Sequence, residues 1–121
     1  MNKLMVIALI FAAAVCSLPY GYAEDDPLVL APESYKKVFE NEQVRVLELE
    51  LKSGDKIVKH SHPDHFVYVM NDATISITKG AETKEVNGKK GEVIWIDAET
   101  HSAENTGPTD FRALVVELKR Q

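Results

Sequence analysis

The sequence predicts an all-β domain, a sandwich or barrel of about nine or ten short strands. Apolar residues recur at every second position from residue 35 onward, which is the period of a strand. Turn signals rich in glycine, asparagine and aspartate separate these stretches at intervals of about 8–12 residues. No segment keeps the helical period for more than a turn or two, so helices should contribute little to the domain.

The first 23 residues are predicted to be a cleaved signal peptide. Lys3 precedes the apolar run LMVIALIFAAAVCSL, which is too short to span a bilayer, because a transmembrane helix needs roughly 20 apolar residues. Gly21 and Ala23 then offer a small-residue cleavage site. We therefore expect a periplasmic or secreted protein with no membrane anchor after cleavage. An uncleaved N-terminal anchor is the alternative.

Composition limits what the remaining 98 of the 121 residues can do, since they suffice for one small domain. Cys16, the single cysteine, lies in the predicted leader, so stability must come from the core or from a metal rather than from a disulfide. The chain has 14 basic and 19 acidic residues and a net charge of −5. An acidic chain without a basic cluster is a poor partner for phosphate-rich molecules, so we expect no nucleic acid to bind.

The first half of the chain divides into an arm and four predicted strands. Residues 24–34 form the N-terminal arm, in which segment 28–30 is expected to pair as an edge strand, and residues 35–121 form the domain. YKKVFE comes first, followed by VRVLELEL, whose apolar positions change phase after Val46 and so predict a bulge. The turn SGD leads into KIVKHSH, and Pro63-Asp64 makes a tight corner before HFVYVM.

The second half contains the predicted strands TISIT, TKEV, GEVIWI, HSAEN and DFRALVVEL. Turns are expected at Asn71-Asp72 and at Lys79-Gly80. Asn87-Gly88 is a strong hairpin signal between TKEV and GEVIWI. The continuous apolar run VVEL in the last strand predicts a central place in a sheet.

Three of the four histidines fall within HSHPDH, and the fourth is His101. His60 and His62 are two positions apart on a predicted strand, so they share a face, and Val58 in the same phase marks that face as the inner one. Two buried imidazoles repel when both are protonated and lose hydrogen bonds when neither has a partner. A divalent metal bound by neutral imidazole nitrogens resolves this conflict. The alternative is a solvated pair on the outer face of an edge strand.

The surroundings of these histidines resemble the two sequence motifs of the cupin family. The first motif is a glycine, five residues and a His-X-His triplet, and segment 54–62 matches it. In the second motif a glycine is followed by a histidine and an asparagine; Gly91, His101 and Asn105 match these positions, whereas Asp97 replaces a proline. The resemblance covers residues 35–118. It implies a cupin-type jelly-roll β-barrel like that of small single-domain bacterial members.

The resemblance also implies that His60, His62 and His101 are metal ligands inside the barrel. The fourth ligand of the family is a glutamate, which this chain lacks at the usual position. Aligning on the segment 67–69 places His65 there instead, and strand parity puts His65 on the inner face. All four histidines would then surround one ion. The alternative leaves His65 at the rim of the corner, solvated or supporting a ligand.

Neutral nitrogen ligands suit divalent transition metals, and the candidates here are Fe(II), Mn, Ni, Cu and Zn. Three histidines with open positions suit Fe(II) and oxygen chemistry, so the first interpretation is a metal-dependent oxygenase acting on a small molecule, with isomerase or lyase activity also open. The second interpretation is a non-catalytic cupin that binds a metal or a small molecule. A homodimer is expected, joined through edge strands or the N-terminal arm.

Asn105 and Trp95 are candidate pocket residues. Asn105 shares its predicted face with His101 and either lines the cavity or braces the following turn. Trp95 either packs in the core, which we favour, or forms an aromatic wall of the pocket.

Four charged residues near these elements have two possible roles. Arg45 and Arg112 lie within strands and are expected to point outward into surface salt bridges, although either would clamp a carboxylate if it faced inward. Asp97 and Glu99 precede His101 and are expected to be solvated. One of these carboxylates is a candidate for orienting an imidazole.

Overall fold

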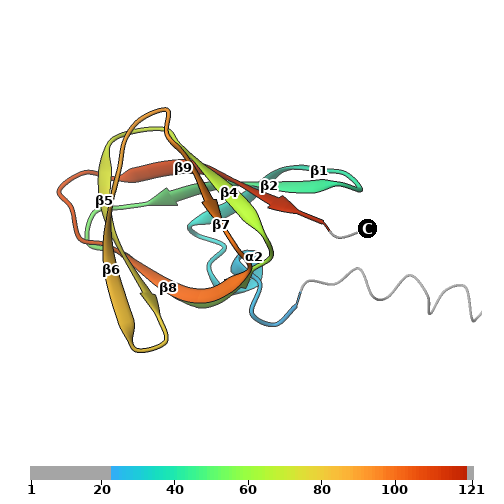
Figure 1. Ribbon diagram of the computed structural model, residues 1–121, viewed down its shortest axis with the longest axis horizontal. Coiled ribbons are helices and arrows are strands. Elements are labelled where there is room, and N and C mark those ends of the chain that lie inside the picture. The colour runs from blue at the N-terminus through green and yellow to red at the C-terminus, as the bar shows by residue number, and fades with distance from the viewer. Residues whose placement is uncertain (1–22, 120–121) are drawn as a thin grey trace, which may run out of the picture.

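Two antiparallel β-sheets face each other in the computed structural model of the protein, which describes residues 23–119 (Figure 1). The all-β prediction is confirmed. The predicted signal peptide, apart from its last residue, Ala23, lies outside the described residues. The strands are β1 (Tyr35–Glu40), β2 (Val44–Leu51), β3 (Lys56–His62), β4 (His65–Val69), β5 (Ala73–Lys79), β6 (Glu82–Gly88), β7 (Val93–Ile96), β8 (Glu99–Asn105) and β9 (Phe111–Leu118).

The five-stranded sheet has the order β1-β2-β9-β4-β7, and the four-stranded sheet has the order β3-β8-β5-β6. The chain passes repeatedly from one sheet to the other, so strands that pair are often far apart in sequence (Figure 1). β9, which contains VVEL, is the middle strand of the larger sheet, as predicted. This jelly-roll arrangement brings β3, β8 and β4 around one interior.

Alternating inward-facing residues of both sheets form the core. In β2, Leu47, Leu49 and Leu51 are 0%, 7% and 1% exposed. Ile57 and Ile75 join the same buried cluster from the four-stranded sheet. Full burial of each such side chain contributes roughly 1.5–3 kcal/mol. These contacts fix the two sheets against each other, and with them the side chains that share their inner faces.

The N-terminal arm does not pair as an edge strand, so that prediction is wrong. Residues 27–30 form the short helix α2 (Pro27–Leu30). The side chain of Asp26 caps it by accepting a hydrogen bond of 2.8 Å from the Leu28 amide, and Pro27 opens it because proline has the required φ and needs no donor there. No helix among the described residues is long and apolar enough to cross a membrane.

The bulge predicted within VRVLELEL is also misplaced. β2 pairs with β9 in an unbroken register, and a register shift lies instead in β1, between Lys37 and Phe39. The change of phase arises because Arg45, only 7% exposed, occupies an inward position, so that Val44 and Val46 face outward. A buried charge interrupts the apolar pattern without interrupting the strand.

A bulge in β3 decides where the first histidines point. Ile57 pairs with Ala103 and His60 pairs with His101, so three steps along β3 match two steps along β8. The extra residue resets the alternation of side chains. Val58 is 58% exposed, and the inference that it marks the inner face is wrong. His60 points inward nonetheless, because the bulge lies between the two.

The hairpin predicted at Asn87-Gly88 does not form. Both residues belong to β6, where they pair with Thr74 and Ala73, and the chain turns after them, at residues 89–92, where Gly91 has a φ of +88°. The turn predicted at Lys79-Gly80 does form between β5 and β6, and Gly80 there has a φ of +61°. Gly88 serves close packing instead: a Cβ atom there would lie 3.3 Å from Cγ1 of Val69. After Gly88 the chain crosses to β7 in the other sheet.

Candidate metal centre

Three histidines converge inside the barrel from neighbouring strands. His60 and His62 extend from β3, and His101 extends from β8 directly opposite His60. They are 0%, 5% and 6% exposed. One ring nitrogen from each lies within 4.8 Å of the others. This spacing allows a single ion to contact all three, as the sequence predicted for these residues.

His65 borders this group from the opposite sheet. It begins β4, immediately after the Pro63-Asp64 corner, and is 1% exposed. Its ring centroid lies 4.6 Å from that of His62. The predicted inward orientation of His65 is therefore correct, and a solvated position at the rim is excluded. Metal ligation by His65 remains a prediction.

Backbone carbonyl groups hold two of the imidazoles. Nδ1 of His60 lies 2.7 Å from the carbonyl oxygen of Val58, and Nδ1 of His65 lies 2.7 Å from that of Pro63. A carbonyl oxygen only accepts hydrogen bonds, so each Nδ1 carries the proton and donates it. The bulge in β3 and the proline corner thus each supply an acceptor two residues before a histidine.

Carboxylates hold the other two imidazoles. Nδ1 of His62 lies 2.6 Å from Oε2 of Glu117, and Nδ1 of His101 lies 2.6 Å from Oε2 of Glu99. Burial alone would raise the pKa of each carboxyl group, but the hydrogen bond from its histidine, with help from a nearby cation, holds the pKa below the usual value. Both groups therefore stay ionised, and each accepts a hydrogen bond from the Nδ1–H group of its histidine.

All four imidazoles consequently have the same tautomer. With Nδ1 protonated, each Nε2 keeps its lone pair for another partner. In metal sites, a ligating histidine ordinarily donates its other nitrogen to a carboxylate or a carbonyl oxygen in this way. The hydrogen bonds of the four Nδ1 atoms are thus those of metal-binding histidines, so the residues present fit a bound metal.

Glu117 is part of a buried chain of charges that the sequence analysis missed. Its Oε1 lies 2.7 Å from Arg45, and Arg45 lies 2.9 Å from Oδ2 of Asp26. The expectation of an outward Arg45 is therefore wrong. A signal existed in the last strand, because Glu117 follows Ala113 and Val115 in the inward phase. This series of charged side chains links Asp26, in the N-terminal segment, to the ring of His62.

Two further expectations about charged residues have clear outcomes. Arg112 points outward as predicted and lies 3.8 Å from Glu50. Glu99 orients His101, which was one of the two roles considered for the acidic pair before it. Asp97, the other member, instead accepts a hydrogen bond of 2.8 Å from the indole of Trp95.

Tyr35 is a second residue that the sequence analysis missed. Its hydroxyl group lies 3.3 Å from Nε2 of His60, and the side chain is only 4% exposed. Burial, and then the nearby charge of Glu117, raise the pKa of Tyr35 well above its usual value. The group is therefore a neutral phenol that donates to Nε2 of His60.

Burial keeps His60, His65 and His101 uncharged. It lowers the pKa of His60 to about 4, helped by His62 and His101 nearby. Burial and the neighbouring imidazoles also lower the pKa values of His65 and His101. His60, His65 and His101 are thus neutral at physiological pH, and neutral imidazole is the form that binds a metal ion.

Acid should destabilise the metal-free protein through this cluster. The pKa of His60 is about 4 in the folded state and ordinarily 6.5, so the unfolded state binds the proton more tightly between these values. The free energy of unfolding should therefore fall as the pH drops from 7 to 4, by about 3 kcal/mol at about 1.4 kcal/mol per pKa unit. Urea denaturation at several pH values measures this. His60→Asn should flatten the slope; an equal slope in both proteins would contradict the explanation.

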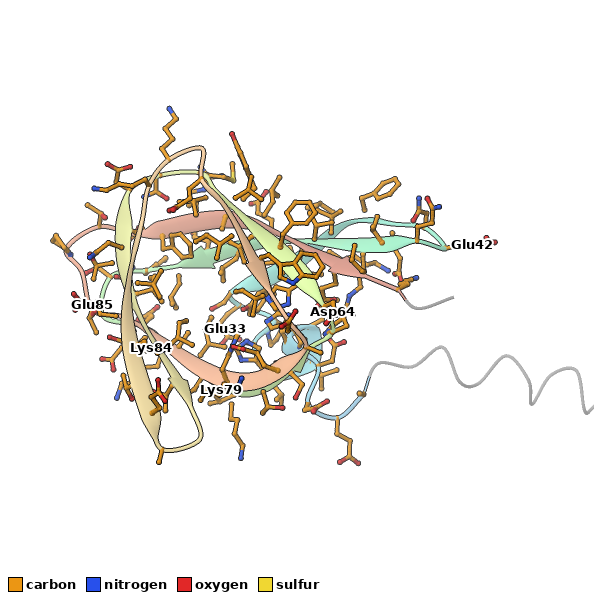
Figure 2. All side chains as sticks on the ribbon, viewed as in Figure 1. Glu33, Glu42, Asp64, Lys79, Lys84 and Glu85 are labelled. Carbon is orange, nitrogen blue, oxygen red and sulfur yellow. The ribbon has the colours of Figure 1, made fainter. Side chains whose placement is uncertain are left out.

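A large apolar cavity adjoins the histidines. Its volume is about 720 Å³, and a smaller cavity of about 80 Å³ borders the imidazoles and shares five of its wall residues. Lys79 and Lys84 of the β5–β6 hairpin, both labelled in Figure 2, line the large cavity together with Glu99. The shared apolar walls are Val67, Ile75, Ile77, Ile96 and Phe111.

Trp95 is neither core nor a wall of this cavity, so both expectations for it are wrong. Its side chain is 53% exposed on the outer face of β7. Ile94 and Ile96 line the cavity from the same strand. All four residues of β7 are apolar, so the alternation that usually identifies the inner face is absent.

Asn105 braces a turn and does not line either cavity. It is 1% exposed, and its Nδ2 donates hydrogen bonds of 2.8 Å to the carbonyl oxygens of Leu51 and Thr109. Its Oδ1 accepts one of 3.0 Å from the amide of Gly107. Of the two roles considered for Asn105, the structure supports the structural one.

Replacing Asn105 with alanine should therefore reduce stability and leave the metal site intact. Three hydrogen bonds are lost and a buried carbonyl group is left without its partner, which costs about 2–3 kcal/mol. Urea denaturation measures the loss, and elemental analysis checks the metal. Asn87→Ala, at an exposed position, is the matched control and should change stability by at most about 0.5 kcal/mol. Loss of metal from Asn105→Ala that had kept its fold would contradict this assignment.

Solved structures of other proteins have a similar fold. No family model matches the sequence, and no curated protein matches it. A cupin domain from Bordetella pertussis matches the structure with a TM-score of 0.67 and 20% identity, over 71% of this chain and 92% of that one. An RmlC-like cupin with a double-stranded β-helix fold from Methanocaldococcus jannaschii matches with a TM-score of 0.59 and 16% identity, over 69% and 77%.

A structure with a named activity is also similar. The polyketide cyclase RemF from Streptomyces resistomycificus matches with a TM-score of 0.54 and 23% identity, over 69% of this chain and 63% of that one. The protein is thus a double-stranded β-helix protein with a buried histidine cluster. Its fold is the cupin fold, as the sequence motifs implied, and its group of three histidines has the spacing of a metal site.

Proposed function

We propose that the protein binds one divalent transition metal through His60, His62 and His101, with His65 as a fourth ligand. The observation that carries this proposal is the set of four hydrogen bonds from Nδ1 to oxygen acceptors. They leave the Nε2 lone pairs of His62, His65 and His101 available to an ion, and that of His60 accepts a hydrogen bond from Tyr35, which a bound ion would displace. Neutral imidazoles packed this closely gain little from one another, and a cation gives them a common partner.

The charges around the cluster favour a ligand with an anionic or oxygen donor group. Arg45 lies 2.7 Å from Glu117, and Lys79 lies 3.5 Å from Glu99, so both nearby carboxylates are offset by cations. A divalent ion held by neutral nitrogens would keep its charge and attract such a donor. Imidazole suits Fe, Zn, Cu and Ni, and we favour Fe(II).

The function we propose is oxygenation of a small, largely apolar molecule. The apolar cavity of about 720 Å³ is of the size that holds an ordinary ligand, since ligand pockets measure roughly 300–1,000 Å³. Bound Fe(II) would supply the oxygen-activating chemistry. The aliphatic walls would exclude water, Glu117 and Glu99 would hold His62 and His101 in orientation, and the Tyr35 hydroxyl group would offer a hydrogen bond.

A non-catalytic binding protein is the second candidate. The same apolar cavity supports it, because the cupin fold serves enzymes and binding proteins alike. The two candidates differ in turnover, since only the oxygenase consumes oxygen when it meets its ligand.

Oxygen uptake by the Fe(II)-loaded protein separates the two candidates. Protein expressed without an affinity tag should contain about one divalent ion per chain by elemental analysis. Diketones, catechols, thiols and amino acids then form the test panel, and an apolar member should give turnover that polar members of equal size do not. The control is the His60→Ala, His101→Ala variant treated with the same iron. Tight binding of a panel member without uptake would favour the binding protein.

The export and location of the protein belong to the same proposal. We propose that residues 1–23 are removed on export and that the mature protein works in the periplasm or outside the cell. An intact mass matching residues 24–121 after expression of the full sequence would support this. Retention of the whole chain in the membrane fraction would contradict it.

A further inference from the structure

The two sheets have outer faces of opposite character. On the four-stranded sheet, outward residues of neighbouring strands are polar apart from Val58: Ser61 pairs with Thr100, and Ser76 lies between Glu104 and Glu85. Such a face is typical of a sheet that water covers. This face shows what a water-covered sheet looks like in this protein, and the other sheet can be compared with it.

The outer face of the five-stranded sheet is apolar instead. One row of paired residues crosses all five strands without a polar member. A second row beside it is apolar across three strands. The first row is Phe39, Val46, Val116, Phe66 and Trp95, and the second begins Val93, Tyr68 and Leu114.

The largest of these side chains are open to solvent. Trp95 and Phe39, at the two ends of the first row, are each 53% exposed, and Val93 and Tyr68 are 61% and 41% exposed. Single exposed apolar residues are common on monomers, but a contiguous apolar surface of this extent ordinarily marks an interaction site. The chain between residues 23 and 119 supplies nothing that covers it.

We infer that this apolar face, the eight residues of the two rows, is the interface of a homodimer in which two five-stranded sheets pack face to face. The exposed parts of these side chains amount to on the order of 600 Å², given that an aromatic side chain offers roughly 150–250 Å². With the charged residues at the border included, this approaches the roughly 800 Å² per partner of a standard interface.

The border of the face is self-complementary in charge. Arg112 is half exposed beside Glu48 and Glu50, at 4.0 Å and 3.8 Å, so both signs occur together at one end. A two-fold axis sets this border against its own copy, which pairs each sign with its opposite. A membrane partner fits less well, because the chain has a net charge of −5 and the border is not basic.

This arrangement differs from the pairing of edge strands expected from the sequence. Edge pairing would join β1 or β7 to a second copy through backbone hydrogen bonds and leave the apolar rows in water. Packing the two faces together removes both rows from water and therefore buries more apolar surface than edge pairing would. The inference is independent of the metal.

Sedimentation equilibrium of the full mature chain over a range of concentrations tests the dimer. Wild-type protein should have twice the mass of the chain. The variant Val93→Lys, Trp95→Lys puts two charges into the apolar face and should weaken association by about 100-fold or more, since large aromatic residues such as tryptophan dominate interfaces. Thr83→Lys, an exposed threonine on the polar outer face, is the matched control and should remain a dimer.

Circular dichroism and metal content check that the double variant keeps its fold. If it does, a monomeric variant reports the loss of the interface and not unfolding. A monomeric wild-type protein would overturn the inference, and so would a dimer that survives both lysines, which would point to edge pairing. Wild-type monomer that co-sediments with anionic vesicles would replace the second copy with a membrane and would equally overturn it.

Discussion

Replacing His60 and His101 together with alanine should abolish metal binding. The two residues face each other across β3 and β8, and each supplies a nitrogen to the three-histidine group. Losing a residue that merely supports a ligand lowers metal affinity by about 10–100-fold, so losing two ligands should exceed that range. Elemental analysis and titration with Co(II) measure the effect. Lys59→Ala, an exposed neighbour on β3, is the control and should retain one ion per chain.

His65 requires its own variant because it joins the cluster from the other sheet. If it is the fourth ligand, His65→Ala should change the visible spectrum of the Co(II) form and lower affinity. An unchanged spectrum and affinity would leave His65 as a buried neighbour of the site. Metal content unaffected by the loss of His60 and His101 would remove the metal proposal altogether and leave the fold assignment untouched.

Replacing Arg45 with methionine should be among the most destabilising single changes in the protein. Arg45 lies 2.7 Å from Glu117, whose side chain is 3% exposed, so methionine leaves a buried carboxylate without its cation. Breaking a buried pair by removing one partner costs about 3–5 kcal/mol. Urea denaturation measures the loss. Arg112→Met provides the comparison, because its partners are exposed and its loss should cost at most about 1 kcal/mol.

The paired variant Arg45→Met, Glu117→Leu separates stability from the metal site. Without the carboxylate no unpaired charge remains, so much of the lost stability should return. Metal affinity should not return, because His62 has lost the acceptor that orients its ring, and a decrease of about 10–100-fold is expected. A stability equal to that of Arg45→Met would show that the two residues act independently.

Sequence patterns predicted the all-β fold and the shared face of His60 and His62 because both depend on local spacing, whereas the place of His101 beside them came from the resemblance to the cupin motifs. Alternation over many strands identified an all-β domain, and two-residue spacing placed His60 and His62 on one face. His65 was placed inward by its parity in β4, which the structure confirms. These conclusions need only the geometry of a single strand.

The features that escaped prediction depend on contacts between distant strands. Arg45 and Glu117 are 72 positions apart, and each alone looks like an ordinary charged residue in a strand. The side of β7 that faces inward was undecidable because Trp95 and Ile94 are both apolar. Asn87-Gly88 has the composition of a hairpin turn, but residue 88 is a glycine within a strand, where the side chain of Val69 packs closely against it. In each case the deciding partner comes from another part of the chain.

The bulge between Ile57 and His60 divides β3 into two stretches whose side chains alternate independently. The stretch before it is held by the core and the stretch after it holds the imidazoles, and the two need not share a phase. Deleting Lys59 would remove the extra residue and leave Ile57 opposite Ala103 and His60 opposite His101, so both imidazoles should still point inward, and an unchanged metal content would report it. The direction of the imidazoles is thus set by their pairing with β8 and not by the number of residues that separate them from Ile57, so the ion site tolerates the loss of one residue at that point.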